Sequence, residues 1–264
     1  MNRSNVEQLS EGFTGPVFIY ASGKSAKEFP LAKYKNEKFI VVNGAVREFI
    51  KAGVTPFSYI FDDGSFLKNN IGLVLEAIKV SKFVFMPYFL YIECGLNERV
   101  SDQNKNKIYF IDKVNRRNGL KLESYRLFFL KNILNKKILF KFSRIFYSSK
   151  NIGFSKDMAQ GYFCARTIPY AALQLAYYLG FKKVFFVGLD LNVAVGRFYD
   201  KNDALPTTLD KDYPRHIYPS FEFVAKRIVN DDFEIYNLSA HSKLPENIMP
   251  KITLSQLDGF INEK

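Results

Sequence analysis

The 264-residue sequence has two cysteines, two histidines and no tryptophan. Cys94 and Cys164 are too few for a disulfide framework, and the CxxC spacing of a structural metal site is absent. No uninterrupted apolar run reaches the roughly 18 residues that a membrane-spanning helix needs. The opening stretch MNRSNVEQLSEGFTG lacks the apolar core of a signal peptide. We therefore expect a cytoplasmic protein with reduced thiols, no spanning helix and no metal site.

Positive charge is what the sequence has in excess. It contains 38 Lys and Arg against 26 Asp and Glu, a net charge of +12, and 47% of its residues are hydrophobic. The length and apolar content predict one large domain over residues 1–264 with a substantial core. The surplus of positive charge favours an anionic partner such as nucleic acid, anionic lipid or a phosphorylated sugar. A merely soluble basic surface is the alternative.

Short apolar runs alternate with helical spacing along most of the chain. Residues 17–20, 39–42, 82–86, 184–187 and 234–238 predict strands, and a further strand ends at 62–64. A helix is expected at 45–52, stopped by Gly53, and a long apolar helix within 158–179. The alternation predicts an α/β fold with a mainly parallel, doubly wound, Rossmann-like sheet.

The alternation breaks between residues 95 and 155, which we expect to form a basic, aromatic helical insert or lid. Residues 131–150 carry six basic side chains and no acid, interleaved with Ile, Leu, Phe and Tyr. This composition suits contact with an anionic membrane surface or with nucleic acid. A solvated helix packed on the domain would show the same composition.

Polar residues follow the first two predicted strands. In ASGKSAKEF the turn residues Ser22, Gly23 and Ser25 could hold a phosphate on backbone amides, although neither GxxxxGK[ST] nor GxGxxG is present. An ordinary tight turn is the alternative. Asn43, at the end of the second strand, could read a base or a sugar, and Asn-Gly is also a common turn.

Carboxylates follow two more of the predicted strands. Asp62 and Asp63 in FDDG could bind a metal, orient a sugar or act as a base, or cap the next helix. In KKVFFVGLDLN, Asp190 comes two residues after Gly188 at the end of a strand with no polar residue between Val184 and Val187. Ligands of open α/β sheets bind outside the carboxyl ends of the strands, so Asp190 lines the site or holds the loop that carries Arg197 and Tyr199.

Three side chains could take part directly in a reaction. Arg197 and Tyr199 in GRFYDKND could donate hydrogen bonds to a departing phosphate, or could belong to a surface loop. His216, in DYPRHIYPSF, is the first candidate for a general base, and His241 is a weaker one.

Several motifs together resemble the Kdo-III transferase family of lipopolysaccharide core synthesis, Kdo being 3-deoxy-manno-octulosonic acid. The order FIYASGKSAKEFPL, FIVVNGAVREFI, GVTPFSYIFDDGSFL, GFSKDMAQGY, LAYYLGFKKVFFVGLDL, GRFYD and IYNLS carries the likeness over about residues 15–245. More distantly the chain resembles bacterial sialyltransferases of the Campylobacter type. Both likenesses imply a GT-A-variant domain that uses a CMP-activated keto-acid sugar by inverting displacement, without a metal or cofactor.

The resemblance also implies roles for particular residues. It places CMP on the turn containing Ser22, Gly23 and Ser25, on Asn43 and on Thr167, and makes Tyr199 a helper of phosphate departure. His216 falls within one residue of the sialyltransferase base, with Asp63 in reserve. Arg166 is displaced by one position from the sialyltransferase arginine. The expected donor site is Ser22, Gly23, Ser25, Asn43, Asp62, Thr167, Gly188 and Asp190, and the expected catalytic residues are His216, Asp63, Tyr199 and Arg197.

These observations rank three functions. The first is Kdo transfer from CMP-Kdo to a hydroxyl of the lipopolysaccharide inner core, by an enzyme peripheral on the inner face of the inner membrane. The second is sialic acid transfer from CMP-sialic acid to lipooligosaccharide. The third, nucleic-acid binding, ranks well below because the basic residues form a local cluster. The acceptor sugar, the linkage and the oligomeric state stay open.

Overall fold

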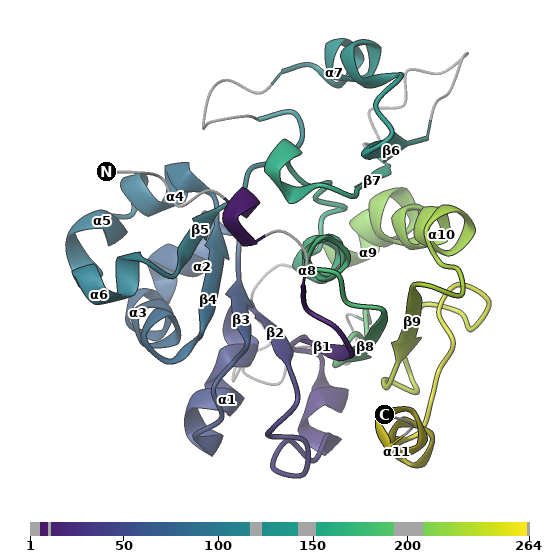
Figure 1. Ribbon diagram of the computed structural model, residues 1–264, viewed down its shortest axis with the longest axis horizontal. Helices are drawn as coiled ribbons and strands as arrows, with labels where there is room; N and C mark the ends of the chain where they lie inside the picture. Colours follow the sequence, from purple (N-terminus) through teal and green to yellow (C-terminus); the bar gives the residue numbers. More distant parts are fainter. Residues whose placement is uncertain (1–5, 10–11, 117–122, 142–151, 193–207, 263–264) are drawn as a thin grey trace.

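The computed structural model describes residues 6–9, 12–116, 123–141, 152–192 and 208–262. Its centre is a seven-stranded sheet with the order β5-β4-β3-β2-β1-β8-β9, in which all neighbours run parallel (Figure 1). The strands are β1 (Pro16–Tyr20), β2 (Phe39–Val42), β3 (Ser58–Ile60), β4 (Phe83–Met86), β5 (Ile108–Phe110), β8 (Lys183–Val187) and β9 (Glu234–Asn237).

Helices cover both faces of this sheet, as the doubly wound prediction requires. One face carries η1 (Val6–Leu9), η5 (Met158–Gln160), α8 (Ile168–Tyr178) and α10 (Tyr218–Arg227). The other carries η2 (Lys24–Glu28), α1 (Val46–Ala52), α2 (Gly64–Asn69), α3 (Ile71–Val80), α4 (Tyr88–Glu93), α5 (Leu96–Arg99) and α11 (Leu254–Asn262). Four short elements also belong to the main body: η3 (Asn43–Ala45), α6 (Asp102–Lys105), α9 (Leu209–Asp212) and a π-helix, η7 (Tyr213–Ile217).

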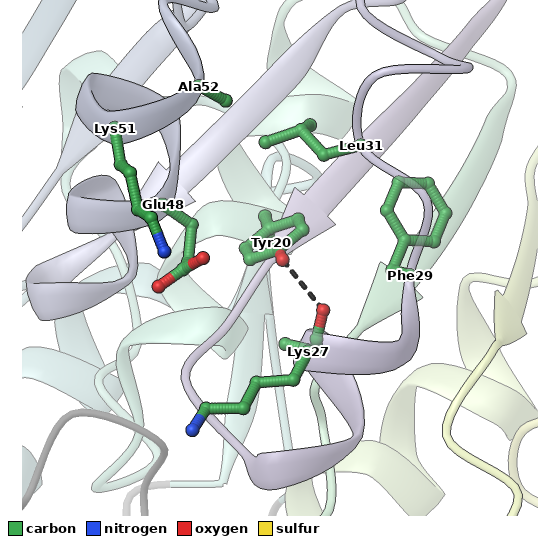
Figure 2. Close-up of a pocket in the computed structure, with 8 residues that line it drawn as sticks. Tyr20, Lys27, Phe29, Leu31, Glu48, Lys51 and Ala52 are labelled. Atoms are coloured by element: carbon green, nitrogen blue, oxygen red, sulfur yellow. Dashed lines mark hydrogen bonds between the residues drawn. The ribbon is translucent and has the colours of Figure 1, made fainter.

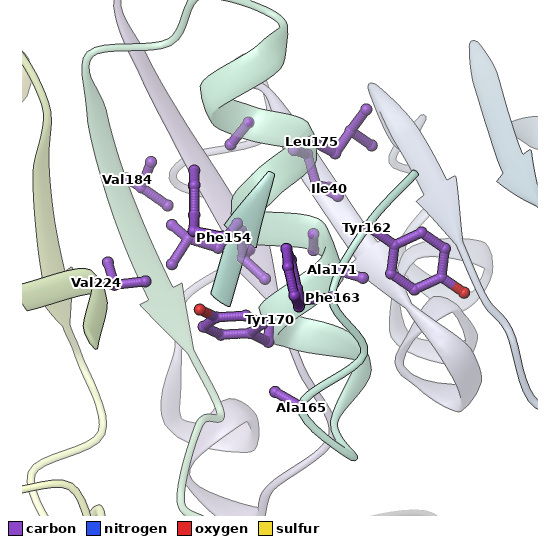
Figure 3. Packing of buried hydrophobic residues seen from close by; sticks show 14 of the residues in the cluster. Ile40, Phe154, Tyr162, Phe163, Ala165, Tyr170, Ala171, Leu175, Val184 and Val224 are labelled. Atoms are coloured by element: carbon purple, nitrogen blue, oxygen red, sulfur yellow. The ribbon is translucent and has the colours of Figure 1, made fainter. Parts of the chain in front are cut away.

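The period-two pattern of the strands divides the core into two clusters. Val17 and Ile19 of β1 pack into the cluster with α8, whereas Phe18 and Tyr20 pack into the cluster with α1. Figure 3 shows the first cluster, in which α8 packs by Ala171 and Leu175 close to Ile40. Each large apolar side chain that is fully buried in this way contributes about 1.5–3 kcal/mol.

The predicted strands agree with the structure, but the helix expected within 158–179 is wrong in its first half. Only η5 forms near its beginning, and α8 begins at Ile168. Gly161 has φ 99°, and Ala165 and Arg166 have φ 45° and 59°, so the chain cannot continue a right-handed helix through them. The sequence pattern also missed β5 and α11.

The segment predicted as an insert, residues 95–155, divides between two places. α5, α6 and β5 belong to the main body. α7 (Tyr125–Asn132) lies with a separate antiparallel pair, β6 (Ile138–Phe140) and β7 (Gly153–Ser155), and this group projects beyond the main sheet (Figure 1). Within the described ranges, no helix is long and apolar enough to cross a membrane.

Candidate active site

The strand order places a topological switch point at the carboxyl ends of β1 and β8. β1 lies between β2 and β8 in the sheet. After β2 the chain crosses one face of the sheet, and after β8 it crosses the other face. Ligand sites of α/β folds form at such a point. The two loops that follow are hydrogen-bonded to each other: Ala21 N donates to Val187 O at 2.8 Å, and Gly23 N donates to Gly188 O at 2.9 Å.

Asp190 holds the first turn in place. Its carboxylate accepts from Ser25 N at 3.1 Å through Oδ2 and from the Ser25 hydroxyl through Oδ1. The Ser25 Oγ also lies 2.8 Å from Ser239 Oγ, so the loops after β1, β8 and β9 meet at one point. Asp190 is only 4% exposed. Asp190 was predicted to line the site or to hold the loop that carries Arg197 and Tyr199, which lies outside the described residues. The loop that it holds here is a different one, the turn at Gly23–Ser25.

Two glycines allow these loops to approach so closely. A Cβ on Gly23 would lie 2.5 Å from both Asp190 Oδ2 and Gly188 O. Gly188 has φ 70°, and a Cβ there would lie 2.7 Å from Ala21 O. Both positions therefore require glycine, for steric reasons at Gly23 and for steric and conformational reasons at Gly188. Ser22, in the loop after β1, is half-buried.

Backbone strain gathers around the same edge. Among the described residues, the non-glycine residues with positive φ are Asn43, Ala165, Arg166 and Leu191. Asn43 directly follows β2, and Leu191 follows Asp190. The Oδ1 of Asn43 is buried without a hydrogen-bond partner. A buried acceptor left unpaired costs about 1–3 kcal/mol, so this atom is suited to receive a donor from a ligand.

The N-terminus of α8 points to this edge. α8 packs across β1 and β2 and enters β8 through a short turn, so it runs antiparallel to the strands and begins at their carboxyl ends. Thr167 is its N-cap residue, yet the Thr167 side chain makes no capping hydrogen bond. The helix dipole favours an anion here. Pro169 has no N–H and Tyr170 N donates to Thr167 O, so the first turn offers an anion few free amides.

Buried side chains fix the loop that leads into α8. Gln174 accepts from Phe163 N at 2.9 Å and from Ser155 N at 3.0 Å, and its amide donates to Phe163 O at 2.8 Å. Tyr170 OH donates to Gly153 O at 2.8 Å. Sequence reasoning missed both residues, because buried polar side chains on an apolar helix give no pattern of their own.

The two neighbouring aspartates have different environments. Asp63 is the N-cap of α2: its Oδ1 accepts from Ser65 N at 2.8 Å and from Phe66 N at 3.1 Å. Asp62 instead accepts from Tyr162 OH at 2.8 Å, and Lys113 Nζ lies 3.6 Å from the same oxygen. The helix-capping role was the alternative predicted for this pair, and Asp63 has it.

The groups around Asp62 stay protonated at neutral pH. Burial, followed by the charge of Asp62, raises the pKa of Tyr162 well above its ordinary value. The same two causes raise the pKa of the Cys164 thiol to about 11. A neutral thiol is a poor nucleophile, so Cys164 is a structural residue. Tyr162, Cys164 and Lys113 were not predicted as part of the site.

The predicted general base lies on the π-helix η7. His216 is half-buried there, immediately before α10. Tyr213 of the same element donates to Lys243 O at 2.6 Å, and Lys243 N donates to Asp190 O at 2.9 Å, which joins this segment to the loop after β8. His241 is exposed. Arg197 and Tyr199 lie outside the described residues.

A cavity of about 220 Å³ lies beside β1, between η2 and α1 (Figure 2). Tyr20, Phe29 and Leu31 form its apolar walls, and Lys27, Glu48 and Lys51 surround it. Tyr20 OH donates to Ala26 O at 2.8 Å. None of the predicted site residues lines this cavity, so we assign the site to the strand ends, where those residues gather.

Known proteins are similar to this chain in sequence and fold. A "Probable 3-deoxy-manno-octulosonic acid transferase" of Escherichia coli strain K12 is 27% identical over 266 residues, covering 98% of this chain and 90% of that protein. The MAf glycosyltransferase of Magnetospirillum magneticum AMB-1 aligns with a TM-score of 0.53 and 11% identity, over 96% of this chain and 38% of that one, and this likeness shows the fold.

The Campylobacter jejuni sialyltransferase CstII, solved with the substrate analogue CMP-3FNeuAc, aligns with a TM-score of 0.46 and 14% identity, over 89% of this chain and 85% of that one. The family model described as "3-deoxy-D-manno-octulosonic acid transferase WaaZ" matches residues 1–255. That match confirms the family that the motif order resembled, and the chain belongs to the WaaZ family of 3-deoxy-D-manno-octulosonic acid transferases.

Proposed function

We propose that this enzyme transfers Kdo from CMP-Kdo to a hydroxyl of the lipopolysaccharide inner core, with inversion at the anomeric carbon. The observation that carries the proposal is the family match over residues 1–255, found on a chain with polar residues at the strand ends around the β1–β8 switch point. Because the acceptor is part of a membrane-anchored lipid, the enzyme would work at the inner face of the inner membrane.

The donor would lie across the carboxyl ends of β1 and β2. In the turn at Ser22–Ser25, the amides of Ser22 and Lys24 would bind the CMP phosphate, because the amides of Gly23 and Ser25 already donate to Gly188 and Asp190. The positive end of the α8 dipole at Thr167 would face the same phosphate. The unpaired Oδ1 of Asn43 would accept a hydrogen bond from the nucleotide. Asp190 and Gly188 would shape this surface without touching the donor, since Asp190 is occupied by Ser25.

In the reaction, the acceptor oxygen would form a bond to the anomeric carbon while the bond from that carbon to the CMP phosphate breaks. The electron pair of the broken bond leaves with CMP, and His216 takes the proton of the acceptor hydroxyl. Tyr199 and Arg197 would donate hydrogen bonds to the departing phosphate as its charge develops. Assigning the base to His216 leaves Asp63 to its N-cap role.

The test is CMP release from freshly made CMP-Kdo and, separately, from CMP-sialic acid, with and without a lipid A core acceptor. We expect acceptor-dependent release from CMP-Kdo. Release from CMP-sialic acid alone would make the enzyme a sialyltransferase, and no release from either donor would contradict the proposal.

The same assay tests the base. His216→Ala should lower turnover by roughly 10²–10⁴-fold, the range for loss of general base catalysis, while CMP binding persists. His241→Ala is the matched control, because this second histidine is exposed and lies outside the proposed machinery. Equal turnover of the two variants would remove His216 from the mechanism.

A further inference from the structure

The projecting group formed by α7, β6 and β7 exposes an apolar surface. Six large hydrophobic side chains are exposed in the described part of the chain, and four of them fall within eight residues: Leu127 at 46%, Leu130 at 63%, Ile133 at 59% and Leu134 at 90%. We call these four residues the apolar tip. Such a concentration marks an interaction site on a protein surface.

The apolar tip is held outward by a well-defined local structure. Leu127, Leu130 and Leu134 have the spacing i, i+3, i+7, so they follow one another along one side of α7 and the turn after it. Phe128 and Asn132 face the other way and are buried, at 1% and 7% exposure. The inner face of α7 is therefore packed against the core, and no residue that the structure describes covers its outer face.

Hydrogen bonds fix the turn that presents Ile133 and Leu134. Asn135 Nδ2 donates to Asn132 Oδ1 at 3.0 Å and to Gln160 Oε1 at 2.7 Å. Asn135 Oδ1 accepts from Lys137 N at 3.0 Å. Phe129 stacks on Phe140 of β6 at 4.4 Å between ring centroids, which joins α7 to the strand pair. The exposure of Leu134 is thus a property of a structured turn.

The charges around the apolar tip select its partner. From residue 124 to residue 156 the sequence has no Asp or Glu. The same stretch has four lysines in or next to α7 and β6: Lys131, Lys136, Lys137 and Lys141. All four lysines are exposed. Lys131 and Lys137 pair with Glu123 and Asp157, which lie at the two ends of this acid-free stretch. A protein partner that covered the apolar tip would have to be both apolar and acidic, whereas an anionic lipid leaflet presents both properties in one surface.

We infer that the apolar tip inserts into the headgroup region of an anionic membrane, with the neighbouring lysines at the level of the lipid phosphates. This inference rests on the proposed function for its biological context, because a lipid-anchored acceptor lies in such a leaflet. It adds the surface that meets the lipid. In this arrangement the leucines supply the depth of insertion and the lysines supply selectivity for negative charge.

Vesicle flotation tests the inference directly, using the full chain with phosphatidylcholine vesicles that contain or lack phosphatidylglycerol. We expect binding to the anionic vesicles only. Leu130→Ser combined with Leu134→Ser should weaken binding on the order of a hundredfold, about tenfold for each leucine withdrawn from the interface. Lys136→Gln should weaken binding to anionic vesicles about fivefold.

The chain offers a matched control. Ile92 and Leu254 are the other exposed large hydrophobics, at 45% and 36%, and lie on α4 and α11. Ile92→Ser and Leu254→Ser should float like the wild type. Binding that is unchanged in the double leucine variant, or lost equally in the controls, would overturn the inference. A concentration-dependent dimer that only the double variant loses would show that a second copy covers the apolar tip.

Activity separates this inference from the proposed function. On a deacylated, water-soluble core oligosaccharide, the double leucine variant should release CMP from CMP-Kdo at the wild-type rate. On the same acceptor embedded in vesicles, its turnover should fall with its binding. Wild-type flotation without any turnover would contradict the proposed function alone, and turnover on vesicles without flotation would contradict the membrane contact alone.

Discussion

Asp190 explains why a carboxylate stands at the end of a strand buried on both faces. A buried carboxylate is costly unless hydrogen bonds replace its water, and here an amide and a hydroxyl of Ser25 do so. The charge-assisted bonds fix the turn after β1 to the loop after β8. At the proposed donor site, Asp190 would act through the backbone that it positions.

Gly23→Ala tests this arrangement. The new Cβ would lie 2.5 Å from Asp190 Oδ2 and Gly188 O, so the turn must move away from the loop after β8. A displacement of about 1 Å at a positioned group costs on the order of a hundredfold in kcat/KM. We expect such a loss in CMP release from CMP-Kdo, with the secondary structure by circular dichroism unchanged.

Gly72→Ala is the control for that variant. Gly72 lies in α3 with no atom within 4 Å of its Cβ position, so alanine should stabilise the helix by about 0.5–1 kcal/mol and leave turnover unchanged. Wild-type kcat/KM in Gly23→Ala would mean that the first turn does not have to stay against Asp190.

At the scale of elements, the local sequence pattern was enough to predict the buried strands. It failed for elements whose bounds depend on tertiary contacts. β2 was predicted at its observed bounds because FIVV is apolar and bounded by a turn. β5 is three residues long and lies at the sheet edge, and its apolar run Ile108–Ile111 stands within a polar, charged stretch that was predicted as an insert. The start of α8 depends on the positive φ of Ala165 and Arg166, which no apolar spacing reveals.

The sequence was enough to predict which strand ends form the candidate site. It was not enough to predict which side chains contact each other there. Parallel strands bring Ser25, Asn43 and Asp190 to one edge, and that follows from sequence alone. The pairing of Ser25 with Asp190 spans 165 residues, and the pairing of Asp62 with Tyr162 spans 100. Both depend on the strand order, with β8 next to β1, and on where the loop before α8 folds back. Local residue patterns do not encode either fact.

Asp63 tests the distinction between a helix cap and a base at the level of one element. Asp63→Asn keeps an oxygen that can cap α2 but cannot take a proton at neutral pH, so stability and turnover should both stay near wild type. Asp63→Ala removes the cap and should cost about 1 kcal/mol of unfolding free energy, measured by urea denaturation. A large loss of turnover in Asp63→Asn with unchanged stability would restore Asp63 as the base.

On the scale of the whole molecule, the buried tyrosines place titratable phenol groups in the interior. Two of the fully buried tyrosines, Tyr162 and Tyr170, hold their phenolic protons through bonds to Asp62 and to the Gly153 carbonyl. Burial raises the pKa of several groups: Tyr20, Tyr162, Tyr170, Tyr213, Tyr236 and Cys164. Packing so many phenols thus makes the fold sensitive to alkali.

Stability should therefore fall as the pH rises above about 9. In the unfolded chain the thiol and the phenols lose their protons near their ordinary pKa values of 9.0 and 10.0, whereas in the folded chain the pKa of Cys164 is about 11 and that of Tyr213 about 12. Between those limits the unfolded state binds fewer protons, so each group lowers the unfolding free energy by about 1.4 kcal/mol per pH unit. Urea denaturation from neutral pH to pH 11 measures this slope. Tyr170→Phe should make it shallower, because one buried phenol is gone. A midpoint that stays constant up to pH 11 would contradict this prediction. It would mean that the thiol and the phenols have the same pKa values in the folded chain as in the unfolded chain.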